Sequence, residues 1–121
     1  MDLYPTLLEA AGVPVTHYIE GQSFMPVLKG GTPTRQDRYL FFSRREGNLR
    51  YNGKTVEAVR LGAWKLVQNS PYAPPELFNL EEDPLEQDDL SKDYPGIFRR
   101  LAAALRRHIQ EAGKVPWQRS Q

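Results

Sequence analysis

Two short segments that alternate between apolar and polar residues meet at a glycine, and they constrain the fold more than any other part of the chain. Residues 56–61 (VEAVRL) and 64–67 (WKLV) alternate with the period of two that is typical of β-strands. Only Gly62 and Ala63 separate the segments, and glycine in the first turn position suits a type II′ turn. The sequence therefore predicts a tight β-hairpin.

Two further strands are expected on either side of this hairpin. Residues 39–42 (YLFF) form a short aromatic run without helical spacing, which predicts a buried strand. Residues 77–80 (LFNL) follow a proline-rich link and predict another strand. Residues 44–55 are rich in Arg, Gly, Asn and Lys, so we expect a long polar loop there. These strands most simply form a four-stranded antiparallel sheet.

A long amphipathic helix is predicted after the sheet. Pro95 suits the first turn of a helix, and Gly113 follows the last apolar residue of the helical pattern. The apolar residues fall within an arc of about 140° on this helix; they are Ile97, Phe98, Leu101, Ala102, Leu105, Ile109 and Ala112. The opposite side carries Arg99, Arg100, Arg106 and Arg107. We expect the apolar arc to cover one face of the sheet.

Two shorter helices are predicted before the sheet. Asp2 is expected to cap the first helix and Ser23 the second. The first helix has an apolar stripe formed by Leu3, Leu7, Leu8 and Ala11, and the second carries Phe24, Val27 and Leu28. The predicted fold class is therefore α+β, with two short helices, a small antiparallel sheet and a long C-terminal helix. We expect residues 1–31 to form a helical linking segment and residues 32–121 to form the subdomain with the sheet.

Size, charge and cysteine content exclude several classes of function. With 121 residues the chain has the size of one domain. Its formal net charge is +1, so no overall field attracts a polyanion, and we expect no nucleic-acid partner. No apolar run is long enough to span a bilayer, and we expect no membrane partner. The chain has no cysteine, which excludes disulfides, thiol nucleophiles and cysteine-bound zinc.

Motifs that would carry catalysis or bind a metal are incomplete. Residues 53–55 (GKT) end like a P-loop, but Asn48 stands where the first glycine is required. His17 and His108 are the two histidines, and their spacing does not suit a shared metal. The acidic residues between 81 and 89 lack the ligand alternation and the glycine of a calcium-binding EF-hand loop, and a solvated turn explains them. We therefore assign no catalytic residue and no metal ligand to this chain.

Arg44, Arg45 and Tyr51 are the candidate binding residues. A guanidinium group can hold a sulfate or a carboxylate through two parallel hydrogen bonds, and a tyrosine adds a further donor. The alternative is a polar loop whose arginines pair with nearby carboxylates. The residues alone leave both interpretations open.

Five short motifs occur in a fixed order along most of the chain. The hairpin region 58–66 reads AVRLGAWKL, and ELFNL and DPLE follow at 76–80 and 83–86. Residues 2–14 contain DLYPTLL and AGVP, and residues 20–30 contain EGQS and PVLKG. These motifs resemble the C-terminal region of the sulfatase (arylsulfatase) family, within the alkaline phosphatase superfamily. In that family the hairpin typically reads A-x-R-x-G-x-W-K-L.

The resemblance implies a small sheet and helix attached to a large α/β catalytic domain that this chain lacks. In that family a cysteine or serine within C/S-x-P-x-R becomes formylglycine, whose hydrate attacks sulfate, and a calcium ion stabilises the charge. This chain has no such motif, so both groups are implied only for the missing domain. Loops of this region can border the family's substrate cleft, which suggests substrate-proximal positions for Arg44, Arg45 and Tyr51. Phe78 and Ala63 depart mildly from the family's usual tyrosine and aspartate.

We interpret the chain as the C-terminal subdomain of a sulfatase, a sulfuric ester hydrolase. It would buttress the missing catalytic domain, wall part of the substrate pocket and be inactive alone. The alternative is a stand-alone, non-catalytic interaction module that acts through self-association. We expect the isolated chain to self-associate, because faces that would contact the missing domain are exposed. Members of the family are often secreted, periplasmic or lysosomal; we find no signal segment in this sequence and assign no compartment.

Overall fold

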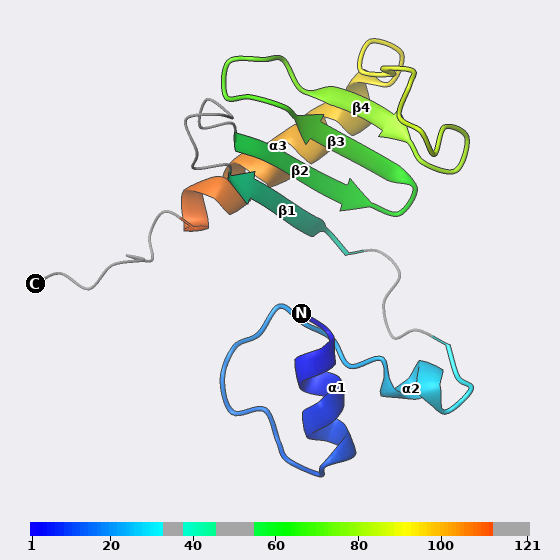
Figure 1. Cartoon of the computed structure of the whole chain (residues 1–121), viewed down its shortest axis with the longest axis vertical. Coiled ribbons are helices and arrows are strands. Elements are labelled where there is room, and N and C mark those ends of the chain that lie inside the picture. The colour runs from blue at the N-terminus through cyan, green and yellow to red at the C-terminus, as the bar shows by residue number, and fades with distance from the viewer. Residues whose placement is uncertain (33–37, 46–54, 113–121) are drawn as a thin grey trace, which may run out of the picture. The chain divides into compact units, whose positions relative to one another are not determined.

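The chain folds into two compact units, Met1–Gln36 and Asp37–Gln121. The structure is a computed structural model that describes residues 1–32, 38–45 and 55–112. Figure 1 labels the helices and strands of both units.

The second unit contains a four-stranded antiparallel sheet with the strand order β1-β2-β3-β4. The strands are β1 (Leu40–Arg45), β2 (Thr55–Leu61), β3 (Trp64–Gln68) and β4 (Glu76–Asn79). Each strand therefore pairs with the strand that follows it in the sequence (Figure 1). The long helix α3 (Pro95–Ala112) completes the unit, and the α+β prediction is confirmed.

The hairpin between β2 and β3 turns at the predicted residues. Leu61 pairs with Trp64, so Gly62 and Ala63 form a two-residue turn. Gly62 has a φ of 58°, the left-handed region that the first position of a type II′ turn requires. The Nε–H of Arg60 also donates to the carbonyl oxygen of Gly62 at 2.8 Å. Local sequence thus determines this turn.

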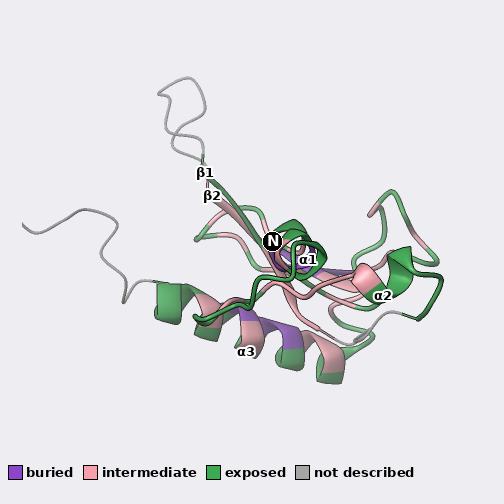
Figure 2. Ribbon diagram, turned by 90° about the horizontal axis from the view of Figure 1, so that it is seen from below, coloured by how far each residue is buried: buried purple, intermediate pink, exposed green. Residues whose placement is uncertain are grey.

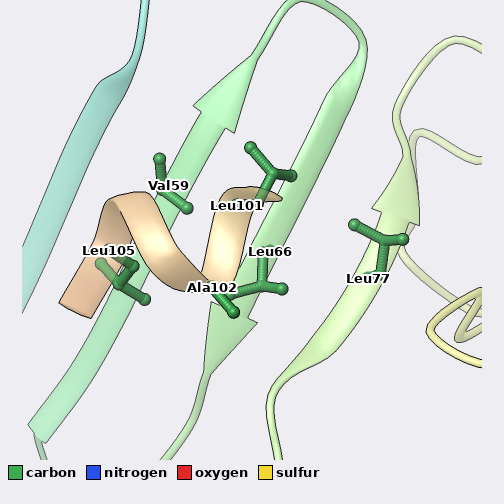
Figure 3. Packing of buried hydrophobic residues seen from close by; sticks show 6 residues of the cluster. All are labelled: Val59, Leu66, Leu77, Leu101, Ala102 and Leu105. Carbon is green, nitrogen blue, oxygen red and sulfur yellow. The ribbon is translucent and has the colours of Figure 1, made fainter. Parts of the chain in front are cut away.

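The main hydrophobic core lies between the sheet and α3. Figure 3 shows side chains from three strands meeting side chains from the helix: Val59, Leu66, Leu77, Leu101, Ala102 and Leu105. Four of these side chains (Val59, Leu66, Leu77 and Leu101) are fully buried. Each large apolar side chain contributes about 1.5–3 kcal/mol by leaving water, so this layer is the main source of the unit's stability.

The apolar arc predicted for α3 is buried over most of its length but not at its end. Ile97 and Phe98 pack at the edge of the core. Ile109 is 39% exposed and Ala112 is exposed. The prediction was wrong for these last two positions, because helical periodicity says which side a residue lies on but not how far the sheet extends. In Figure 2 the buried residues of α3 follow one side of the helix.

The outer edge of β4 is closed by the segment that leads to α3. The backbone N–H of Leu77 donates to a carboxylate oxygen of Asp89 at 3.0 Å. The carbonyl oxygen of Leu77 accepts the N–H of Leu90 at 2.8 Å. Both backbone groups of a buried edge residue are therefore satisfied, which removes a site for pairing with another strand.

Strand β1 is longer and less buried than the sequence predicted. It runs from Leu40 to Arg45 and so includes two residues that were assigned to the polar loop. The expectation of burial was wrong for Phe42, which is 55% exposed, whereas Tyr39, Leu40 and Phe41 are half-buried. An aromatic run is compatible with an exposed edge strand as well as a buried one, and β1 is an edge. The rest of the loop up to residue 54 lies outside the described residues.

The first unit contains two short helices, α1 (Leu3–Ala10) and α2 (Met25–Leu28). Its buried residues on α1 are Pro5 and Thr6, whereas Leu3 and Leu7 are each 65% exposed. Leu8 is half-buried and Ala11 is exposed, so most of the expected apolar stripe of α1 is not covered within this unit.

Polar contacts hold the first unit together. Asp2 does not cap α1 with its side chain; its carboxylate instead accepts the N–H of Gln22 at 3.0 Å. The hydroxyl of Thr6 donates to the Asp2 carbonyl oxygen at 2.7 Å and accepts the Phe24 N–H at 3.0 Å. The Ser23 hydroxyl accepts the N–H of Met25 at 3.2 Å, but the N-cap residue of α2 is Phe24, so the predicted cap at Ser23 was wrong by one residue.

Across residues 1–32, 38–45 and 55–112, no helix is both long and apolar enough to cross a membrane.

Candidate functional site

A groove of about 490 Å³ lies on the face of the sheet that α3 does not cover. Successive residues of a strand point to opposite faces. Because Val59 and Leu66 face α3, their neighbours Ala58 and Val67 face the groove. The groove is lined by Phe42, Ser43, Arg44, Val56, Ala58, Arg60, Lys65, Val67 and Leu80. We call this surface the open face of the sheet.

The floor of the open face is apolar. Ala58, Val67 and Phe78 form a second buried cluster, and Val56 and Leu80 pack against it. This cluster draws residues from three strands and is separate from the core under α3. An apolar sheet face of this kind is a surface that normally packs against another layer of structure.

Three cationic side chains line the groove. Arg60 and Lys65 are directly opposite each other on β2 and β3, and Arg44 lies on β1. Like charges directly opposite each other on neighbouring strands are unfavourable. The Lys65 ammonium is paired with a carboxylate oxygen of Glu86 at 2.5 Å, which offsets part of this repulsion. The groove therefore combines an apolar floor with a positively charged rim.

The candidate residues predicted from the sequence do not all lie together. Arg44 pairs with Val56 and lines the groove. Its neighbour Arg45 pairs with Thr55, and strand alternation places the two arginines on opposite faces of the sheet. Tyr51 lies outside the described residues.

Arg60 and Lys65 were missed as site residues, although the sequence contained a signal for them. Both lie in the alternating segments on either side of the two-residue turn. That turn fixes the hairpin register, and the register sets Arg60 opposite Lys65 on one face. What the sequence did not provide was the pairing of β1 with β2, which brings Arg44 to the same face.

Both histidines pack against aromatic rings. The ring of His108 stacks on Phe41, with centroids 4.0 Å apart and planes 2° apart. His17 lies 5.9 Å from the ring of Tyr4, centroid to centroid. The ring of His108 is therefore part of the packing between β1 and α3.

The acidic segment before α3 uses two carboxylates to hold its backbone. Asp83 accepts the N–H groups of Gln87 at 2.6 Å and Asp88 at 3.0 Å. Burial raises the pKa of Asp89, but hydrogen bonds from Leu77 and Ser91 outweigh it, so this pKa lies below its ordinary value. These contacts agree with the solvated-turn interpretation. In the described part of the chain no group of three His, Asp or Glu side chains could hold a metal ion.

Comparison with known proteins places these features in a family. Residues 1–114 match the family model described as "N-sulphoglucosamine sulphohydrolase, C-terminal". Arylsulfatase K of Gallus gallus is 30% identical over 112 residues, which cover 88% of this chain and 21% of that protein.

Two solved structures share both fold and sequence similarity. A putative sulfatase from Bacteroides thetaiotaomicron has a TM-score of 0.78 and 27% identity, over 93% of this chain and 24% of its own. A 2-O GAG sulfatase has a TM-score of 0.77 and 27% identity, again over 93% of this chain and 24% of its own. The chain thus spans about a fifth to a quarter of the length of these proteins.

Proposed function

This chain belongs to the family of N-sulphoglucosamine sulphohydrolase C-terminal domains, and we propose that it serves as the C-terminal subdomain of a sulfatase. It is homologous to arylsulfatases and matches only about a fifth to a quarter of each. The reaction would be the hydrolysis of a sulfuric ester, carried out by a catalytic domain of the same enzyme.

The role proposed for this subdomain is to buttress the catalytic domain through the open face of the sheet. The observation that carries this proposal is the apolar floor built from Ala58, Val67 and Phe78, on the face away from α3. Phe42, at 55% exposure, adds an aromatic side chain to the same groove. Ala58, Val67 and Phe78 are already buried within this chain, so a domain packed here would remove mainly the exposed Phe42 side chain from water, which favours association.

A charge placed in the groove tests this role. In a full-length sulfatase containing this chain, Phe42→Asp would place a carboxylate inside the proposed contact and should lower the thermal stability and the activity together. Tyr72→Asp is a matched control, because Tyr72 is 98% exposed and the change in charge is the same. Equal effects of the two variants would contradict docking through the open face.

The catalytic groups would lie in the other domain. The family implies a formylglycine nucleophile and a calcium ion there, and the described residues of this chain do not fit either group: Asp83 and Asp89 already accept backbone N–H groups. The chain's own residues would contribute packing and charge at the domain contact.

Reading the coding DNA upstream of the codon for Met1 tests this arrangement directly. An open frame containing C/S-x-P-x-R would support the subdomain role. A stop codon and a ribosome-binding site close to Met1 would instead support the stand-alone interaction module.

We also propose that Arg44 walls part of the substrate pocket. It lies at the rim of the groove, where a guanidinium could hold a sulfate oxygen pair. In the full-length enzyme, Arg44→Gln should raise KM more than it lowers kcat. Arg45→Gln is the matched control, since this neighbouring arginine lies on the other face of the sheet. Unchanged kinetics in the Arg44 variant would contradict the proposal.

The proposed substrate class is a sulfated carbohydrate. It is supported by the names of similar proteins, which include an N-sulphoglucosamine sulphohydrolase family and a 2-O GAG sulfatase. Assays with a sulfated disaccharide and with an aryl sulfate of equal charge would separate this class from small aromatic esters.

Self-association of the isolated chain follows from the same exposed surface. Without a catalytic domain, two copies can cover each other's open faces. Light scattering at tens of micromolar should then show a dimer or larger species that Phe42→Asp converts to a monomer. A monomeric parent chain at that concentration would contradict this expectation.

A further inference from the structure

The side of α3 that faces away from the sheet carries two pairs of arginines. Arg99 and Arg100 form one pair, and Arg106 and Arg107 form the other, seven residues later. Seven residues are close to two helical turns, so the pairs lie on one side, on the order of 10 Å apart along the axis. Ala103 lies between them and is exposed. We call these four residues the arginine stripe.

The guanidinium groups of the stripe retain donors for a ligand. Arg100 donates from Nε to the hydroxyl of Tyr39 at 3.0 Å, and Arg106 donates from Nε to the carbonyl oxygen of Ala102 at 3.4 Å. Each therefore keeps both terminal nitrogens. Arg99 and Arg107 make no hydrogen bond or ion pair within the described residues. All four side chains are exposed.

Acidic side chains that could neutralise the stripe lie elsewhere. Glu111 is the one acidic residue of α3, and it makes no ion pair with the stripe in the part of the chain that the structure describes. The acidic residues before the helix include Glu86, which pairs with Lys65, and Asp83 and Asp89, which hold backbone N–H groups. The positive charge of the stripe is therefore left for an external anion.

We infer that the arginine stripe binds a sulfated polysaccharide. The inference rests on the proposed function for the identity of the polymer. A guanidinium binds a sulfate group through parallel hydrogen bonds, and two pairs two turns apart can contact successive sulfate groups of one chain. A polymer held here raises the local concentration of its other sulfate groups at a catalytic centre.

The position of the stripe is compatible with domain docking on the open face. The groove lies on one face of the sheet, and α3 covers the other face. The stripe lies on the side of α3 opposite to the buried Leu101 and Leu105. A domain that covers the groove thus leaves the stripe accessible.

The chemistry favours sulfated polysaccharide over nucleic acid. Binding of single strands without sequence preference uses aromatic rings that stack on bases, and the stripe has alanine between its arginine pairs. The ring of Tyr39 is already engaged by Arg100, whose Cζ lies 5.9 Å from the ring centroid. Sulfate groups need only the guanidinium donors that the stripe provides.

The test is direct binding of the full chain to a fluorescent heparin oligosaccharide. Affinity should fall as salt rises from about 50 to 200 mM, because ion release drives such binding. Arg99→Gln/Arg107→Gln should weaken binding about tenfold, because it removes two of the four cations that would contact sulfate groups. Glutamine has nearly the helix propensity of arginine, so α3 should stay helical by circular dichroism.

Matched variants separate the stripe from general charge. Lys29→Gln/Lys92→Gln removes the same charge from two exposed lysines elsewhere and should change affinity less than about twofold. Arg99→Lys/Arg107→Lys should recover part of the loss. The inference is overturned by equal losses in the two glutamine pairs, by absence of binding at low salt, or by equally tight binding of single-stranded DNA. Because binding needs no catalysis, a negative result would leave the subdomain proposal standing.

Discussion

The helices α1 and α3 carry apolar stripes, but only α3 buries its stripe. Leu101 on α3 is fully buried against the sheet, whereas Leu7 on α1 is 65% exposed. The first unit holds together instead through polar contacts around Thr6, which is 3% exposed. The difference shows that a stripe predicts where a partner binds and not that the partner is present. We propose that the catalytic domain supplies the partner for α1 as well as for the open face.

Truncating one leucine on each helix of the isolated chain should affect stability very differently. Leu101→Ala should lower the free energy of unfolding of the second unit by about 2–5 kcal/mol, because it removes a fully buried side chain and leaves a cavity. Leu7→Ala is the matched control and should cost less than about 0.5 kcal/mol. Urea titration followed by tryptophan fluorescence and circular dichroism would measure both. Similar costs for the two leucines would remove the distinction between the helices.

In the full-length enzyme the leucines of α1 and α3 should respond more alike to truncation. In a full-length sulfatase that contains this chain, Leu7→Ala should become costly, by about 2–3 kcal/mol, if a catalytic domain covers α1. The measurement is thermal unfolding of the full-length variants, with Leu85→Ala as the control, since Leu85 is 75% exposed. A loss no larger than that of the control would show that α1 stays uncovered in the enzyme.

A pair of glycine substitutions probes close backbone packing in each unit. A Cβ on Gly21 would lie 2.3 Å from the Met1 carbonyl oxygen, so Gly21→Ala should shift the backbone and destabilise the first unit by about 1–3 kcal/mol. A Cβ on Gly96, at the start of α3, meets nothing within 4 Å. Gly96→Ala should therefore stabilise the second unit by up to about 1 kcal/mol. Hydrogen exchange of α1 and α3 would report each effect, and destabilisation by Gly96→Ala would contradict the open environment.

The smallest effect concerns the closed edge of β4. Asp89→Ala removes the acceptor for the Leu77 N–H and should cost about 1 kcal/mol at neutral pH. Because the folded pKa of Asp89 is lowered, its contribution is present above the unfolded pKa of about 3.9 and is lost as pH falls through the folded value. The variant should thus lose less stability than the parent between about pH 4 and pH 2. Parallel acid titrations would contradict this role.

Much of the fold could be predicted because its signals are local. The alternation on both sides of Gly62 identified β2, β3 and their turn, and the spacing of apolar residues identified α3 from Pro95 to Ala112. The candidate site could be predicted only in part. Arg44 was identified, but the sequence grouped it with Arg45, which lies on the other face of the sheet.

The errors have a common physical cause. Phe42 and Ile109 were expected to be buried from composition and spacing, yet burial depends on where the neighbouring layer ends. Asp2 was expected to cap α1, yet its carboxylate accepts an N–H from Gln22, twenty residues along the chain. Burial and hydrogen-bond partners depend on contacts between segments that are distant in the sequence, and a short stretch of sequence does not reveal these contacts.

Motifs, turn chemistry and periodicity are local properties of the chain, and they were enough to identify the family, the α+β class and the residues of the hairpin and the long helix. That Arg44, Arg60 and Lys65 share one groove, and that Leu3 and Leu7 of α1 are exposed, became known only from the folded chain. The pairing of β1 with β2 places Arg44 in the same groove as Arg60 and Lys65. The exposure of Leu3 and Leu7 depends on which side chains pack against α1. Both depend on the register between distant segments, which local patterns leave open.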